Sequence, residues 1–120
     1  MIGNAVWFEI PTSNFGRAVT FYEAVFQVSL KRENIGGELA VFPEGDGVYG
    51  ALIHQQGYVP AANGAVIYLS AGVDLKPTLD RVLAAGGSVL KAKTALPPGM
   101  GHYAHFADSE GNRIGLHSDQ

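Results

Sequence analysis

Residues 6–22, "VWFEIPTSNFGRAVTFY", predict a strand, a break and the start of a helix. Residues 5–10 are rich in aromatic and β-branched side chains, which is typical of a strand. The segment "PTSN" ends this strand, and Ser13 or Asn14 can cap the helix that follows. The apolar residues of that helix recur at helical spacing and predict one buried face: Ala18, Phe21, Tyr22, Val25 and Phe26.

The rest of the chain repeats this order of elements. Three strands, "VSLKRE", "ELAVF" and "GVYGALIH", follow the first helix, with turns of hairpin length between them. A second strand–helix unit begins at residues 65–70, with Asp74 as a cap candidate. The strand "SVLKAK", the loop "TALPPGMG" and the hairpin "HYAHFADSEGNRIGLHS" come next, and the apolar face of the second helix comprises Leu75, Leu79, Val82 and Leu83. The pattern is therefore βαβββ, twice, with a period of about 60 residues.

Composition excludes several classes of protein. The 120 residues suit a single domain and carry a net charge of −3. No run of Lys or Arg suggests nucleic acid as a partner, and no stretch approaches the length of a membrane span. The chain has no cysteine and no basic segment followed by an apolar run at its start. We therefore expect a cytoplasmic protein without a signal peptide, a disulfide or a membrane or nucleic-acid partner.

Three segments together resemble the vicinal oxygen chelate superfamily, which includes glyoxalase I, bleomycin-resistance proteins and extradiol dioxygenases. They are "FEIPTSNFGRAVTFYEAVF", "VDLKPTLDRVLAAGG" and "GHYAHFADSEGNRIGLHS". The resemblance implies an α+β fold in which two βαβββ modules, about 3–56 and 62–118, form curved mixed sheets around a cavity. It also implies a homodimer, whose subunit contact completes or borders the cavities.

The resemblance further implies where a divalent metal would bind, with one ligand from the first and fourth strand of each module. Those positions fall on Trp7, on Val66 or Ile67, on Gly115 and, on the fourth strand, near His54. Trp7, Val66 and Gly115 cannot ligate a metal. We therefore expect no cofactor at the standard site.

Other residues are candidates for a small-molecule pocket. Side chains two apart share a face of a strand, so Glu9 accompanies Trp7, and His117 and Arg113 accompany Gly115. The loop 94–103 can form a lid at the cavity mouth, with Met100 as an adaptable apolar contact, or it can be a rigid connector between two strands. The predicted ligand-binding set is Trp7, Glu9, His54, Tyr68, Met100 and His117.

Each candidate also has a structural interpretation. Glu9 can form a buried hydrogen bond or an ion pair, for instance with Arg17, and His54 and His117 can be ordinary strand-end residues. His102 and His105, three apart, should lie on opposite faces of their strand, and neither is assigned to the site.

The predicted function is that of a metal-independent small-molecule binding protein of the glyoxalase/bleomycin-resistance type. The alternative is a lyase, isomerase or dioxygenase that uses a relocated metal site, in which Glu9, His54 and His117 form a two-histidine, one-carboxylate triad. A metal-free variant of this enzyme would use Glu9 and His117 as acid and base. A third alternative is an interaction module with a vestigial cavity.

Overall fold

The computed structural model describes residues 2–120 and has the order βαβββ twice. The first module contains β1 (Trp7–Pro11), α1 (Phe15–Phe26), β2 (Lys31–Asn34), β3 (Glu38–Val41) and β4 (Tyr49–His54). The second contains β5 (Ile67–Ser70), α2 (Lys76–Ala84), β6 (Ser88–Ala95), β7 (His102–Ala107) and β8 (Arg113–Ser118). The predicted α+β class and the two modules are confirmed.

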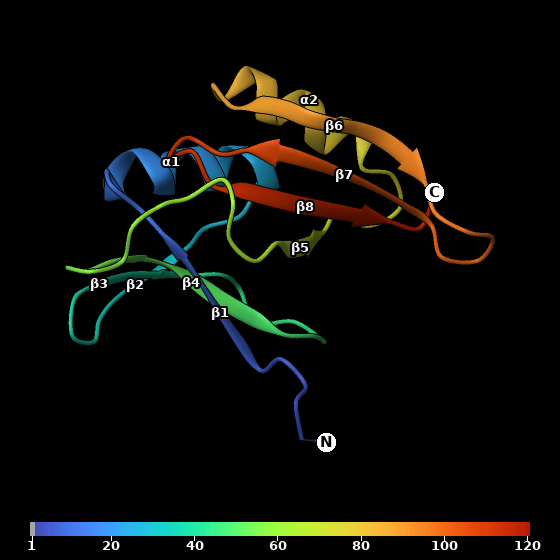
Figure 1. Cartoon of the computed structure of the whole chain (residues 1–120). Coiled ribbons are helices and arrows are strands. Elements are labelled where there is room, and N and C mark those ends of the chain that lie inside the picture. Colours follow the sequence, from blue (N-terminus) through green and yellow to red (C-terminus); the bar gives the residue numbers. More distant parts are fainter. Residues whose placement is uncertain (1) are drawn as a thin grey trace.

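Each module forms one four-stranded mixed sheet. Sheet A has the order β1-β4-β3-β2, and sheet B has the order β5-β8-β7-β6. In both sheets the first strand runs parallel to the fourth, and the other neighbours are antiparallel. Figure 1 shows the two sheets as separate layers joined by the segment between β4 and β5.

The first helix follows its sequence signals closely. Asn14 is the N-cap, and its side-chain oxygen accepts a hydrogen bond from the backbone N–H of Arg17 at 3.0 Å. Gln27 ends the helix in the left-handed conformation. The predicted apolar face is buried apart from the partly exposed Phe26, and it also includes Phe15 and Val19.

The second helix differs from the prediction at two positions. Leu75, and not Asp74, is the N-cap, although the Asp74 carboxylate accepts a hydrogen bond from the N–H of Lys76 at 2.9 Å. Leu83 was placed on the buried face but is 55% exposed. The buried stripe is narrow and follows Leu75, Thr78, Leu79 and Val82, and the next residue turns away from it. Within the described residues, neither helix is long and apolar enough to cross a membrane.

The two helices contact each other and cover one face of each sheet with a single apolar core. Alternate residues of the central strands enter this core, such as Leu52 of β4 and Leu116 of β8. The opposite face of each sheet carries no helix, and we call it the outer face. On sheet A, the outer face has a small apolar cluster of its own formed by Leu39, Val41, Ala51 and Ile53.

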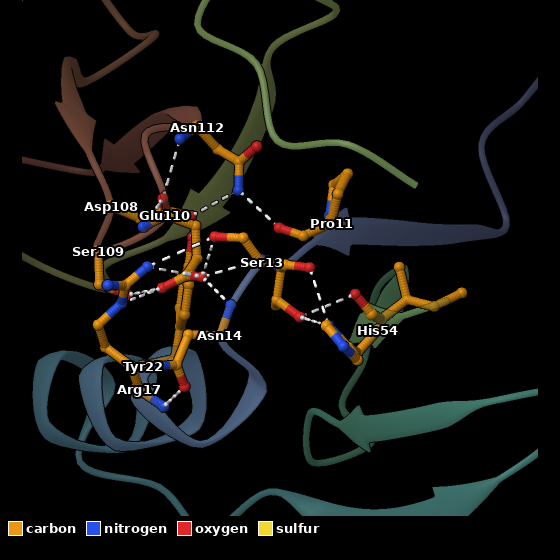
Figure 2. A network of polar contacts seen from close by, with 12 residues as sticks. Pro11, Ser13, Asn14, Arg17, Tyr22, His54, Asp108, Ser109, Glu110 and Asn112 are labelled. Carbon is orange, nitrogen blue, oxygen red and sulfur yellow. Dashed lines mark hydrogen bonds and ion pairs between the residues drawn. The ribbon is translucent and has the colours of Figure 1, made fainter. Parts of the chain in front are cut away.

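A buried turn of module 2 joins the two modules (Figure 2). Asp108, at the end of β7, accepts a 2.6 Å hydrogen bond from the hydroxyl of Tyr22 in α1. The Asp108 carboxylate also accepts from the backbone N–H groups of Glu110 and Asn112. The amide nitrogen of Asn112 donates to Asp108 and to the carbonyl of Pro11, which ends β1. Burial, followed by the Asp108 charge, raises the pKa of Tyr22 well above its ordinary value.

The same turn caps the first helix from outside its own module. The carboxylate of Glu110 accepts hydrogen bonds from the backbone N–H groups of Ser13 and Asn14 and from the side chain of Arg17, whose Nε lies 2.8 Å away. Arg17 therefore pairs with Glu110 and not with Glu9, which corrects the partner suggested for Glu9. Although burial acts in the opposite direction, these hydrogen bonds lower the pKa of Glu110 from 4.5 to about 2.

Removal of the Tyr22 hydroxyl tests the junction. We expect Tyr22→Phe to lower the free energy of unfolding by about 1–3 kcal/mol, because the buried Asp108 carboxylate loses a donor. Urea denaturation measures the change, and Tyr58→Phe, at an exposed ring, is the matched control. Equal stability of the two variants would contradict the role of this hydrogen bond.

The Glu110 cap predicts an acid-dependent term in stability. Because the folded-state pKa is depressed, the ionised carboxylate stabilises the fold above pH 4.5, and this stabilisation is lost as the pH falls toward about 2. We expect Glu110→Gln to be less stable than the parent at pH 7 by about 1–3 kcal/mol, with the gap closing in acid. Urea titrations at several pH values measure this gap, and Glu44→Gln in an exposed loop should show none. A gap that persists unchanged at pH 2 would argue against the ionised cap.

Candidate functional site

A groove of about 490 Å³ lies between the edge strands β1 and β5. Trp7 and Glu9 line it from β1, and Tyr68 lines it from β5. The two aromatic rings are open to solvent, with Trp7 40% and Tyr68 50% exposed. The structure thus brings together three of the six residues that the sequence placed in a ligand pocket.

Trp7 and Glu9 form one unit on the outer face of sheet A. The indole N–H of Trp7 donates to the Glu9 carboxylate at 3.3 Å, and the indole ring meets Tyr49 edge-on at 5.4 Å. Glu9 is level with Ala51 in the β1–β4 register, next to the apolar cluster of this face. The glutamate in the first strand therefore offers a negative charge beside an aromatic wall.

His54 does not join this group. It lies three residues after Ala51 on β4, so its side chain points to the opposite face from Glu9. Its Nδ1 lies 3.0 Å from the carbonyl of Thr12 and 3.2 Å from the Thr12 hydroxyl, and its ring contacts Phe15. The strand-end interpretation of His54 agrees with this position, and the expectation that it faces the ligand pocket does not.

His117 and Met100 meet at a second hollow of about 340 Å³ beside the loop after β6. The Nε2 of His117 lies 2.7 Å from the backbone carbonyl of Met100 and donates to it. This hydrogen bond connects the loop after β6 to β8. Glu9, His54 and His117 therefore do not converge, and no set of three His, Cys, Asp or Glu side chains in residues 2–120 is arranged to hold a metal ion.

The standard metal position on the last strand is filled by another residue. Gly115 is paired with Tyr68 in the β5–β8 register, and a Cβ added to Gly115 would overlap the ring of Tyr68. On β5, Ile67 packs against the core, and Val66, the residue before β5, lines the groove with an apolar side chain. The residues at these positions do not fit the superfamily's metal.

One residue that contacts the groove residue Tyr68 was not assigned from the sequence. His105 of β7 is also level with Gly115, on the outer face of sheet B, and its Nε2 lies 2.7 Å from the hydroxyl of Tyr68. The guanidinium of Arg113 lies 2.9 Å from its Nδ1. Burial, followed by the charges of Arg113 and Lys91, lowers the pKa of His105. The alternation that put Arg113 on the face of Gly115 applies equally to His105 once the hairpin register is known.

Comparisons with known proteins place this geometry in a family. The family model described as Glyoxalase/Bleomycin resistance protein/Dioxygenase superfamily matches residues 4–116. At the level of sequence, no curated protein matches the chain.

Solved structures give the same result for the fold. A glyoxalase/bleomycin resistance protein from Streptomyces sp. CB03234 aligns with a TM-score of 0.74 and 23% identity over 96% of this chain and 100% of its own. TnmS3, an antibiotic binding protein from the same organism, aligns with a TM-score of 0.65 and 22% identity, covering 100% and 99%. The fosfomycin resistance protein FosX from Listeria monocytogenes aligns with a TM-score of 0.68 and 13% identity, over 100% of this chain and 96% of its own. At these identities the likeness concerns the fold alone.

The filling of the metal position by Tyr68 can be tested by rebuilding the missing ligand. We expect Gly115→Glu to destabilise the fold by about 1–3 kcal/mol, because the new side chain collides with the Tyr68 ring. Adding Tyr68→Ala should recover most of that loss. Thermal and urea denaturation measure both, and Gly45→Glu, at a position with open space around it, is the control. If Gly115→Glu is as stable as Gly45→Glu, Tyr68 does not occupy the position.

Proposed function

The chain belongs to the Glyoxalase/Bleomycin resistance protein/Dioxygenase superfamily, and on this premise we propose that it is a cytoplasmic, metal-independent binding protein for planar aromatic small molecules. The observation that carries the proposal is the groove between β1 and β5. Two exposed rings, Trp7 and Tyr68, and one carboxylate, Glu9, line this groove. A few polar groups within aromatic walls are typical of a small-molecule pocket.

Each wall of the groove has a role in this proposal. The rings of Trp7 and Tyr68 supply stacking surfaces, and Val48 and Val66 supply apolar contact. Glu9 is fixed beside the indole by their hydrogen bond and attracts a positive charge. The indole and phenol faces also favour a cation. The preferred ligand is therefore planar, aromatic and positively charged.

The residues at the positions implied for metal ligands support binding without a metal. Gly115 cannot carry a ligand while Tyr68 covers it, and His54 faces away from the groove. TnmS3, whose fold is similar, is an antibiotic binding protein, which agrees with a binding role on this frame. Sequestration of a ligand needs a shaped pocket but no reacting group.

We further propose that the protein acts as a homodimer. The outer faces of both sheets carry no helix, and the apolar cluster of sheet A lies beside the open groove. A second copy placed against the outer face of sheet A would close the open side of the groove and leave the outer face of sheet B free. The exposed rings of Trp7 and Tyr68 would then face an enclosed groove in which a ligand can stack on them.

The groove can be tested with a cationic dye because Trp7 is the single tryptophan of the chain. We expect ethidium to bind, quench the Trp7 fluorescence and bind equally well in the presence of EDTA. Glu9→Gln should weaken ethidium binding by about three- to tenfold, the effect of one partly exposed charge, in isothermal titration calorimetry. The uncharged analogue phenanthridine should bind parent and variant alike.

The control variant for the dye experiment is Glu44→Gln, which removes an exposed loop carboxylate that does not line the groove. It should leave ethidium binding unchanged. Failure of the parent to bind either compound, or binding only when a divalent metal is added, would contradict the proposed function.

A further inference from the structure

A row of side chains crosses the outer face of sheet B next to the groove. Tyr68 of β5 is level with Gly115 of β8, which is level with His105 of β7, and His105 in turn is level with Lys91 of β6. Because Gly115 has no side chain, the Tyr68 ring extends over it and its hydroxyl reaches His105 at 2.7 Å. The glycine therefore allows a contact between two strands that are not neighbours.

The partners of His105 determine where its proton lies. A guanidinium has only donors, so the Arg113 contact at 2.9 Å requires a lone pair on Nδ1 of His105. A neutral imidazole with a free Nδ1 carries its hydrogen on Nε2, where it donates to the Tyr68 oxygen. The hydroxyl hydrogen of Tyr68 then points away from His105 and can be donated to a bound molecule. The lowered pKa of His105 favours this neutral form.

Two cations of the same face have no anionic partner in the part of the chain that the structure describes. The lysines and arginines that form ion pairs are Arg17, Lys31, Lys76 and Lys93. The guanidinium of Arg113 contacts the neutral imidazole of His105, and the Lys91 ammonium lies 5.8 Å from the centre of the Tyr103 ring. Tyr103 in turn packs against Tyr68 and His105. The face thus combines two cations that lack an anionic partner with the three adjoining rings of Tyr68, Tyr103 and His105.

We propose that this face is a binding site for aryl carboxylates. The carboxylate is held by the Tyr68 hydroxyl and the Arg113 guanidinium, with Lys91 adding charge. The aromatic ring of the ligand packs on Tyr103. His105 is a positioning residue, which orients the Tyr68 hydroxyl and does not touch the ligand. Tyr68 is the one residue of this site that also lines the groove, and either proposal can fail without the other.

The test uses 2-naphthoate and its uncharged analogue 2-naphthamide in isothermal titration calorimetry with the intact protein. We expect 2-naphthoate to bind at least about tenfold more tightly than 2-naphthamide, because a charge-assisted hydrogen bond contributes at least that much. Arg113→Met should weaken 2-naphthoate binding about tenfold or more, and Tyr68→Phe should weaken it about threefold to tenfold. Lys76→Met, which removes an exposed cation from α2, should change nothing.

Two comparisons separate this site from the groove. Glu9→Gln should retain 2-naphthoate binding, and Arg113→Met should retain ethidium binding. Retained ethidium binding would also show that the Arg113→Met variant is folded. Equal affinity for the acid and the amide, or an Arg113→Met variant that binds 2-naphthoate as the parent does, would overturn the proposal. It would also be overturned if Arg113→Met changed the oligomeric state and the parent bound no 2-naphthoate, since the cations would then serve a subunit contact.

A second measurement is independent of any ligand. Nitrogen-15 NMR of the imidazoles should show His105 as the neutral Nε2–H tautomer at pH 7.5, and Arg113→Met should change its tautomer balance. Finding the hydrogen on Nδ1 in the parent would contradict the Arg113 contact, and with it the orientation of the Tyr68 hydroxyl on which the site depends.

Discussion

The buried carboxylate of Asp108 is the constraint on which the rest of the structure depends. A charge removed from water is tolerated only where donors surround it, and here the donors come from its own turn and from Tyr22 in the other module. The turn therefore reaches its full set of hydrogen bonds only when α1 is in place. Asn112 extends the junction to Pro11 and also accepts from the backbone N–H of Ala61, which fixes the segment between the modules. The end of β1 and the start of β8 are thus set by one turn, and so is the position of Arg113 relative to Glu9.

Local patterns in the sequence were sufficient for the elements and for much of the site. The helical spacing of Phe21, Tyr22 and Val25 predicted the buried face of α1, and the capping role of Asn14 is confirmed. Alternation along β1 put Trp7 and Glu9 on one face, as the hydrogen bond between them requires. Where the prediction was wrong, neighbouring elements decided the outcome. Leu83 has the right chemistry for a core, but the covered stripe of α2 is too narrow to include it.

The contacts that could not be predicted join residues far apart in the sequence. Arg17 has its partner 93 residues away, and nothing near Arg17 distinguishes Glu110 from Glu9 as that partner. The position of His54 depends on where β4 begins, and a shift of one residue would reverse its face. The significance of His105 depends on the register of three strands and on a glycine between two of them. Alternation alone gives the face of a residue but not which residues meet across a sheet.

The Tyr68 ring lies where a side chain at position 115 would stand, and this changes the chemistry of the outer face of sheet B. A divalent metal needs lone pairs that converge on one point, as carboxylates and imidazoles supply them. Here a phenol occupies that volume, and its neighbours Arg113 and Lys91 offer hydrogen-bond donors and positive charge. Glu9, which lines the groove from β1, carries the opposite charge to Arg113 and Lys91. Because Tyr68 borders both regions, a ligand with a cation at one end and a carboxylate at the other would satisfy both. The Tyr68 ring that covers Gly115 thus favours a surface suited to anions, since it leaves its hydroxyl beside the cations.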